Sequence, residues 1–335
     1  MMEFNLGIDN SCSIHLGNQT YIGINRKKMN TNTQHGIAVT GALGNLGWKL
    51  LCHLAQYGEI STLIGLDLPT TTPGKLEHLK TISQKNPRLN YVDLLECDLS
   101  NWDDFRWRDA INRVSTVVHL AAQNPYPDAT WHDATVSLDM THHICQAAKD
   151  SSTLRRVVFA SSNHVMGRYK DKNLLAGELN TELEVGVGTI WHTGHIEIDS
   201  TIYATSKFSG ERICKVTGKI DDGQTSFVII RVGWCQPGLN SPSTLSAAGT
   251  PTKMSDQHDS ELAHTTQWFQ NMWLSNRDFL HLFDSAIKTY SANWPDACIT
   301  VNGMSDNTNM VWNLDSARSY LNYMPEDNVR GGHQI

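Results

Sequence analysis

Three side chains in this sequence could together move a proton and hold a reacting oxygen: Ser162, Tyr203 and Lys207. Tyr203 and Lys207 stand four residues apart, a spacing that puts both on one face of a helix. An ammonium beside a phenol favours the phenolate, so we expect Lys207 to lower the pKa of Tyr203. Tyr203 could then take the proton of a substrate hydroxyl while hydride leaves the carbon, with Ser162 hydrogen-bonded to the same oxygen. A chance pairing on a surface helix is the alternative interpretation.

A hydride needs an acceptor, and the segment 36–67 has the order of elements that binds a dinucleotide. The apolar run 37–39 predicts a buried strand, and leucines at helical spacing predict a helix over 46–56. The turn between them carries the cofactor-binding candidates Gly41, Gly44, Asn45, Leu46 and Gly47. Its glycines permit a tight turn, a close approach of the pyrophosphate and close packing of the helix, whose first N–H groups face the phosphates.

The acid that ends the second predicted strand selects the cofactor. Asp67 lies 20 residues after Gly47, where a carboxylate accepts hydrogen bonds from the adenosine ribose and repels a 2′-phosphate. Leu68 and Pro69 follow it, and neither is a basic residue that would favour NADP. The segment therefore predicts NAD as the cofactor. A glycine turn without a nucleotide is the alternative.

Apolar runs alternate with helical patterns along the chain, which predicts an α/β fold, namely a Rossmann-type doubly wound parallel sheet with ligands at the carboxyl ends of its strands. We expect strands over 37–39, 61–66, 89–95, 116–122, 156–162, 226–232 and 297–301. We expect helices within 46–56, 70–86, 102–111, 133–149, 201–217, 276–289 and 316–321.

The same pattern suggests how the chain is divided. Residues 1–33 form an N-terminal extension, for which a hairpin over 13–24 and disorder are both open interpretations. Residues 34–335 form a single domain. Its Rossmann core spans about 36–167 and 200–235, and a small C-terminal substrate-binding lobe is built from 168–199, 236–275 and 297–335. The segment 238–266 has no periodicity, which favours an exposed flexible loop or, alternatively, a lid over the substrate.

Composition excludes several classes of partner. The net charge of −7 is dispersed and leaves no basic patch for nucleic acid. No apolar run is long enough to span a bilayer. The seven cysteines are scattered without a C-x-x-C pair, which fits a reducing compartment and a cytoplasmic location. Adjacent His142 and His143 point to different helix faces, and His192 and His195 form only a weak pair, so we expect no metal site.

Taken together, these motifs resemble the extended short-chain dehydrogenases/reductases. The matching segments are TGALGNLG at 40–47, CDLS at 97–100, HLAA at 119–122, FASSNHVMG at 159–167, YATSK at 203–207 and RVGWCQP at 231–237. The resemblance implies that Asp98 and Leu99 flank the adenine, that Ala121 and Ala122 line the cofactor, and that Lys207 with Tyr203 contacts the nicotinamide ribose. It also implies a homodimer paired through the helices at 133–149 and 201–217.

Within this superfamily, four segments resemble the uronate dehydrogenases and their archaeal relatives, the NAD-dependent glucose-6-phosphate dehydrogenases. These segments are ASSNH at 160–164 and the stretches 272–279, 301–307 and 323–327. Both groups oxidise the anomeric carbon of an unprotected sugar to a lactone. The resemblance implies a substrate-binding set of Gln123, Asn163, His164, Trp234 and Arg277. For His164, an ordinary histidine at the end of a strand is the alternative.

Departures from that branch bear on the substrate. Trp234 stands where uronate enzymes have a serine, and Trp268 aligns with their carboxylate-binding arginine. A uronate is therefore disfavoured, and Arg277 becomes a candidate phosphate ligand, with a solvated arginine as its alternative. We expect oxidation at C1 of an aldose or aldose 6-phosphate. A nucleotide-sugar epimerase or dehydratase and a non-catalytic NAD-binding regulator are the rival hypotheses.

Overall fold

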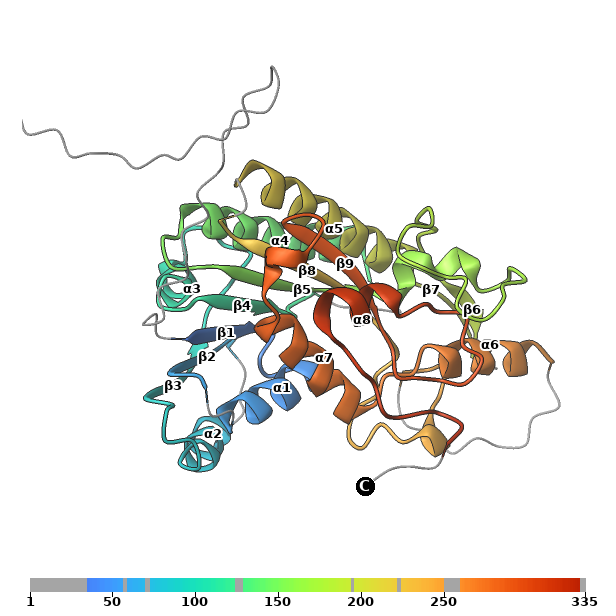
Figure 1. Cartoon of the computed structure of the whole chain (residues 1–335), viewed down its shortest axis with the longest axis horizontal. Helices are drawn as coiled ribbons and strands as arrows, with labels where there is room; N and C mark the ends of the chain where they lie inside the picture. The colour runs from blue at the N-terminus through green and yellow to red at the C-terminus, as the bar shows by residue number, and fades with distance from the viewer. Residues whose placement is uncertain are drawn as a thin grey trace, which may run out of the picture. The chain divides into compact units, whose positions relative to one another are not determined.

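Seven strands form one sheet in the computed structural model, which describes residues 35–56, 59–69, 73–123, 129–193, 196–221, 224–249 and 260–331. These strands are β1 (Gly36–Thr40), β2 (Thr62–Asp67), β3 (Tyr91–Glu96), β4 (Thr116–His119), β5 (Arg156–Ser162), β8 (Ser226–Val232) and β9 (Cys298–Gly303). Their order is β3-β2-β1-β4-β5-β8-β9, and neighbouring strands are parallel (Figure 1). The predicted doubly wound α/β fold is confirmed.

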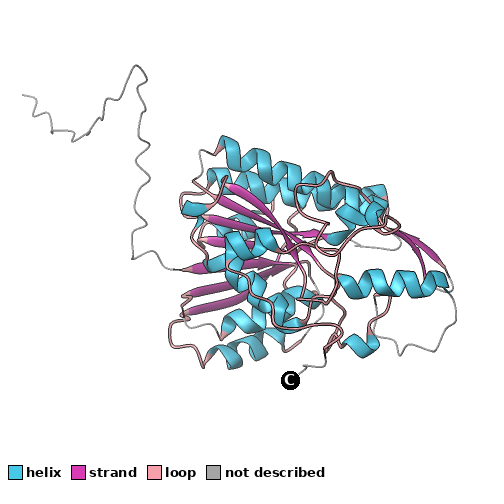
Figure 2. Ribbon diagram, turned by 45° about the vertical axis from the view of Figure 1, so that its right-hand side comes forward, coloured by secondary structure: helices cyan, strands magenta, loops and turns pink. Residues whose placement is uncertain are grey.

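Helices cover both faces of the sheet, as Figure 2 shows. Apolar side chains of α1 (Asn45–Ala55), α2 (Lys75–Ser83), α7 (Asn276–Lys288) and α8 (Asp315–Leu321) share one core with Ile37 and Val39. Those of α3 (Phe105–Ile111), α4 (Trp131–Asp150) and α5 (Thr201–Ile220) share the other core with Ala38. Because successive strand residues face opposite layers, a strand covered on both sides is apolar throughout, and β1 is buried at every position.

The turn after β1 is tight enough to require glycine at two positions. Gly41 has a φ of +65°, a backbone conformation that L-residues with side chains rarely adopt. A Cβ on Gly47 would lie 2.0 Å from the Gly41 carbonyl oxygen, so α1 could not start here with a larger residue. No side chain caps the start of α1 among the described residues, and its first N–H groups are therefore available to a ligand.

The sheet order reverses between β1 and β4, which lie side by side with their crossovers running to opposite sides. Open α/β sheets bind ligands in the crevice that such a reversal leaves outside the carboxyl ends of the strands. The glycine turn after β1 and the residues after β4 lie at this point, and Ser162 ends β5, the next strand. The fold thus brings the sequence-predicted candidates to one edge of the sheet.

The stretches that sequence analysis treated as irregular are partly ordered. Residues 163–200 contain the 3-10 helix η1 (Asn163–Tyr169) and the antiparallel strands β6 (Ile190–His192) and β7 (Glu197–Asp199). The prediction of irregular structure through residue 266 was wrong, because α6 (Ser260–Asn271) begins earlier and buries Trp268 and Phe269. Residues 250–259, the 1–33 extension and His195 lie outside the described residues, so the loop, lid and hairpin interpretations stay predictions.

A buried ion pair connects α5 to the sheet directly below the candidate site. The Arg231 guanidinium on β8 donates two hydrogen bonds of 3.0 Å to the Glu211 carboxylate on α5. The Ser161 hydroxyl on β5 donates to the same carboxylate at 2.6 Å. Arg231 and Glu211 are each 1% exposed. Two charges this deep are tolerated only when paired, so this contact fixes how α5 lies against β5 and β8.

Replacing Glu211 by Gln leaves the Arg231 guanidinium buried without a countercharge, so the free energy of unfolding should fall by about 3–5 kcal/mol. Urea unfolding followed by circular dichroism measures this loss. Asp306→Asn is the control, because it breaks an exposed ion pair with Arg318 and should cost less than about 1 kcal/mol. Equal losses in the two variants would contradict the role given to the buried pair.

Candidate active site

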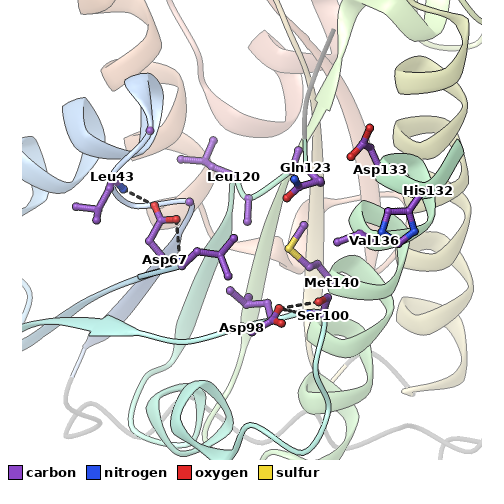
Figure 3. A pocket seen from close by; sticks show the side chains of 16 residues that line it. Leu43, Asp67, Asp98, Ser100, Leu120, Gln123, His132, Asp133, Val136 and Met140 are labelled. Atoms are coloured by element: carbon purple, nitrogen blue, oxygen red, sulfur yellow. Dashed lines mark hydrogen bonds between the residues drawn. The ribbon is translucent and has the colours of Figure 1, made fainter. Parts of the chain in front are cut away.

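A pocket of about 620 Å³ opens at the carboxyl edge of the sheet. Its lining includes the predicted cofactor and substrate candidates Gly41, Gly44, Asp67, Asp98, Leu99, Ala121, Ala122 and Gln123. Figure 3 shows Leu43 and Asp67 at one end of the pocket and Gln123, His132 and Asp133 at the other. The remaining candidates of the turn, Asn45, Leu46 and Gly47, form the first turn of α1. The glycine turn, the acid and the exits of β3 and β4 thus converge on one pocket.

Asp67 is held in place by backbone donors on both carboxylate oxygens. Leu43 N donates to Oδ2 at 2.7 Å, and Leu68 N donates to Oδ1 at 2.8 Å. The first bond joins the end of β2 to the glycine turn. A carboxylate oxygen has two lone pairs, so each still accepts a further hydrogen bond from a ribose hydroxyl. The geometry fits an adenosine ribose at this position.

The end of the pocket that sequence analysis predicts to hold the adenine is built around Asp98 and Leu99. Asp98 Oδ1 accepts hydrogen bonds from Ser100 N at 2.9 Å and from Ser100 Oγ at 2.6 Å. Leu99 is buried, and its carbonyl oxygen lies 2.8 Å from His143 Nδ1 on α4. This end combines an apolar surface with an anchored carboxylate, which is suited to a flat base with polar edges.

Thr40 is a buried residue directly before the glycine turn that sequence analysis did not select. Its hydroxyl accepts hydrogen bonds from Leu120 N at 3.2 Å and Ala121 N at 3.1 Å, and lies 2.8 Å from His119 Nδ1. The hydroxyl therefore joins the end of β1 to the end of β4, the two strands that flank the reversal in sheet order. A polar residue at the last position of a buried, otherwise apolar strand is the signal that could have revealed it.

Ser162 at the end of β5 lies near Tyr203 in the first turn of α5, close enough to lower the pKa of the phenol. Lys207 Nζ, one helical turn further, donates to the Ala160 carbonyl oxygen at 2.7 Å. It lies 5.9 Å from the centre of the Tyr203 ring. The three residues that sequence analysis selected therefore form one cluster.

The expected effect of Lys207 on Tyr203 was wrong for this structure. Burial raises the pKa of Tyr203 to about 12, and the hydrogen bond with Ser162 offsets this only in part. Burial also lowers the pKa of Lys207 to about 8, because the ammonium loses its water. Desolvation thus exceeds the attraction between the two groups, and the phenol keeps its proton at neutral pH.

Asn163 and His164 follow Ser162 in η1, and both are buried. Asn163 Nδ2 donates to the Val232 carbonyl oxygen at 2.9 Å, while its Oδ1 has no hydrogen-bond partner among the described residues. The His164 ring makes an edge contact with Tyr203, at 6.1 Å between ring centres and 77° between planes. Burial lowers the pKa of His164 to about 3, so the imidazole is neutral at physiological pH.

Trp234 belongs to an aromatic group behind the site. Its ring lies edge-on to His164 at 5.9 Å and packs against Phe269 of α6 at 4.2 Å. Its Nε1 donates to the Ser246 carbonyl oxygen at 3.1 Å. Trp268, the residue aligned with the arginine of uronate enzymes, is 4% exposed and packs against Trp312. These described residues therefore form an aromatic and uncharged surface behind the site.

Arg277 is engaged by two carboxylates. Its guanidinium donates to Asp327 at 2.6 Å and 3.2 Å and pairs with Glu326 at 3.0 Å. These contacts hold the C-terminal tail against the start of α7. A substrate phosphate would have to displace both acids, so Arg277 as a phosphate ligand stays a prediction that the geometry does not favour.

A pocket at the reversal point, an acid beside the glycine turn and a serine–tyrosine–lysine cluster define the class: an NAD-dependent enzyme of the short-chain dehydrogenase/reductase type. The sequence matches the NAD dependent epimerase/dehydratase family over residues 37–235, and the chain belongs to this family. Its cofactor is NAD.

Individual relatives extend the similarity beyond the family segment. The chain is 28% identical over 295 residues to an NAD-dependent glucose-6-phosphate dehydrogenase from Haloferax volcanii, covering 87% of this chain and 93% of the relative. It is 26% identical over 293 residues to an L-arabinose 1-dehydrogenase (NAD(P)(+)) of the same organism, covering 87% and 96%. A solved structure titled mutated uronate dehydrogenase superposes with a TM-score of 0.60 at 20% identity, covering 90% and 89%, which supports the fold.

The described residues contain neither a candidate membrane span nor a candidate metal cluster. None of the helices there is both long and apolar enough to cross a membrane. Over the same ranges, no three histidine, cysteine or acidic side chains come together as a metal ion would require.

Replacing Asp67 by Asn should weaken NAD binding by about tenfold and reduce the preference over NADP, because a charge-assisted hydrogen bond is lost and the repulsion of a 2′-phosphate disappears. Fluorescence titration with each reduced cofactor measures both affinities. Asp93→Asn is the matched control, since Asp93 lies on β3 and bonds the Tyr91 hydroxyl. An unchanged ratio of the two affinities in Asp67→Asn would contradict this role.

Proposed function

We propose that this protein is an NAD-dependent sugar dehydrogenase that removes hydride from C1 of an aldose and produces a lactone. The observation that carries the proposal is the cluster of Ser162, Tyr203 and Lys207 at the carboxyl edge of the sheet, next to the cofactor pocket. Two relatives that are named as dehydrogenases of a sugar or a sugar phosphate match the chain over most of its length. This similarity supports a sugar as the substrate.

In this proposal, Tyr203 accepts the proton of the anomeric hydroxyl and Ser162 hydrogen-bonds the same oxygen. NAD, when bound, accepts the hydride from C1. Because burial raises the pKa of Tyr203 to about 12, a standing phenolate is costly at neutral pH. The phenol must therefore pass its own proton on as it takes the substrate proton. Lys207, whose pKa burial lowers to about 8, would hold the ribose hydroxyls of bound NAD next to the phenol.

The charges around the site favour an aldose without a phosphate. Arg277, the candidate for binding a phosphate, is already paired with Asp327 and Glu326. Trp268 offers no charge where a uronate enzyme has its arginine. A neutral sugar needs hydrogen-bond partners and apolar surface instead, and Asn163 Oδ1 is a buried acceptor without a partner in the described part of the chain.

A substrate panel tests the proposal. We expect NADH formation with a neutral aldose at a kcat/KM at least about tenfold above that for its 6-phosphate or its uronate, because Arg277 is already paired with two carboxylates and Trp268 carries no charge. Absorbance at the NADH band measures the rate for glucose, galactose, arabinose, glucose 6-phosphate, glucuronate and a UDP-sugar. Tyr203→Phe is the control, which should lose turnover and keep NAD affinity.

The possible outcomes separate the rival hypotheses. Turnover of the phosphate ester alone would assign Arg277 to substrate binding and overturn the preference for a neutral sugar. Conversion of the UDP-sugar without net NADH would indicate an epimerase. Absence of turnover with NAD still bound would favour a regulator.

We also propose a homodimer that pairs through α4 and α5. Trp131 at the start of α4 and Val216 and Ile220 at the end of α5 are 61%, 56% and 60% exposed, and an interface along these helices would cover apolar side chains at both of its ends. Sedimentation at micromolar concentration should give twice the mass of one chain, and Val216→Glu with Ile220→Glu should shift it to the monomer. A monomeric wild type would rule this arrangement out.

The six described cysteines are free thiols, which supports the cytoplasmic location that we propose.

A further inference from the structure

The segment 186–189 packs directly against the residues that follow Ser162. Gly188 N donates to the His164 carbonyl oxygen at 2.9 Å, and Arg168 N donates to the Gly186 carbonyl oxygen at 3.0 Å. The approach is so close that a Cβ on Gly167 would lie 2.3 Å from both the nitrogen and the hydroxyl of Thr189. The long connection between β5 and α5 is therefore bonded to the site.

Two hydroxyl groups of this connection converge on one imidazole nitrogen. His164 Nδ1 lies 2.8 Å from Thr189 Oγ1 and 3.1 Å from Ser200 Oγ. The two hydroxyl residues are also bonded to each other, because Thr189 N donates to Ser200 Oγ at 2.8 Å and Ser200 N donates to the Thr189 carbonyl oxygen at 3.0 Å. Ser200 is the residue directly before α5, the helix that carries Tyr203.

Counting donors and acceptors assigns the proton on the imidazole. Thr189 is fully buried, and Nδ1 is the one partner of its hydroxyl among the described residues. If Nδ1 carried the proton, the hydroxyl hydrogen of Thr189 would be buried without an acceptor, which costs about 1–3 kcal/mol. If Nδ1 accepts, the hydroxyl is satisfied and the ring proton must be on Nε2.

The same contacts fix the orientation of the ring. One face of His164 stacks on Trp191 at 5.5 Å with 13° between planes, and Tyr203 meets the ring edge-on. Trp191 belongs to β6, in the same connection as Thr189, and its Nε1 donates to the Ala247 carbonyl oxygen at 2.9 Å. Residues between β5 and α5 in the chain therefore contact both one face and one nitrogen of the imidazole, and these contacts fix the orientation of the ring.

We propose that Thr189 and Ser200 are positioning residues, whose hydroxyls hold His164 with its proton on Nε2 and connect the start of α5 to the segment after Ser162. The inference rests on the proposed dehydrogenase activity for its functional consequence. A fixed tautomer makes the opposite edge of the imidazole a permanent hydrogen-bond donor next to Tyr203. The fixed start of α5 keeps the phenol at the distance from Ser162 that the reaction needs.

Thr189→Val tests the kinetic part, because valine keeps the shape and removes the hydroxyl. We expect kcat with the best substrate of the panel to fall by about ten- to a hundredfold, with NAD affinity unchanged. Thr189→Ser restores a hydroxyl and should recover most of the rate, and Ser200→Ala should reduce kcat in the same way as Thr189→Val. Thr225→Val is the matched control, since Thr225 is a buried threonine at the far end of β8 with its hydroxyl bonded to Leu154.

The tautomer itself is measured by long-range proton–nitrogen NMR on protein labelled with nitrogen-15 histidine. His164 is identified by the signals that disappear in His164→Gln. A protonated Nε2 and a bare Nδ1 in the wild type, with a mixture of tautomers in Thr189→Val, would support the inference. A protonated Nδ1 in the wild type, or an unchanged kcat in both hydroxyl variants, would overturn it. If the wild type shows no turnover, the proposed function is contradicted but this inference is not. The NMR measurement of the His164 tautomer then tests the inference without the kinetic data.

Discussion

The buried pair of Glu211 and Arg231 is the contact on which the candidate site depends. It joins α5 to β8, and the Ser161 hydroxyl adds β5 to the same carboxylate. Ser162 is the next residue on β5, and Tyr203 and Lys207 lie on α5 about two turns and one turn before Glu211. The positions of the reacting groups therefore depend on the Glu211–Arg231 pair. Separating the two charges would leave each of them unpaired in an apolar core, which is strongly unfavourable.

Burial determines the protonation states of the side chains in the candidate site. The same loss of water raises the pKa of Tyr203, lowers the pKa of Lys207 and keeps His164 neutral. A site of this kind holds its proton donors and acceptors in their uncharged forms and so favours transfers in which no isolated charge persists. The hydroxyl groups of Ser162, Thr189 and Ser200 suit such a site, because each can donate and accept without a change of charge.

The sequence was sufficient for the fold and for the choice of NAD as cofactor, because both depend on local patterns. The glycine turn requires Gly41 and Gly47 in order to close, and a strand covered on both faces must be apolar through its middle, as residues 157–160 are. The tail contacts of Arg277 and the links from Thr189 and Ser200 to His164 depend on segments far apart in the chain. No periodicity encodes them. The pKa of Tyr203 was mispredicted because spacing reports a neighbouring lysine but not the loss of water around both groups.

Hydride transfer from C1 is the central claim, and the most direct measurement follows that hydrogen. An aldose that turns over is prepared with deuterium at C1 and incubated with NAD, and the mass of the reduced cofactor is determined. The account predicts that the reduced cofactor gains one deuterium and that the sugar is recovered as a lactone without it. Unlabelled reduced cofactor would place the oxidation at another carbon, and label retained in a sugar of altered configuration would replace the dehydrogenase with an epimerase.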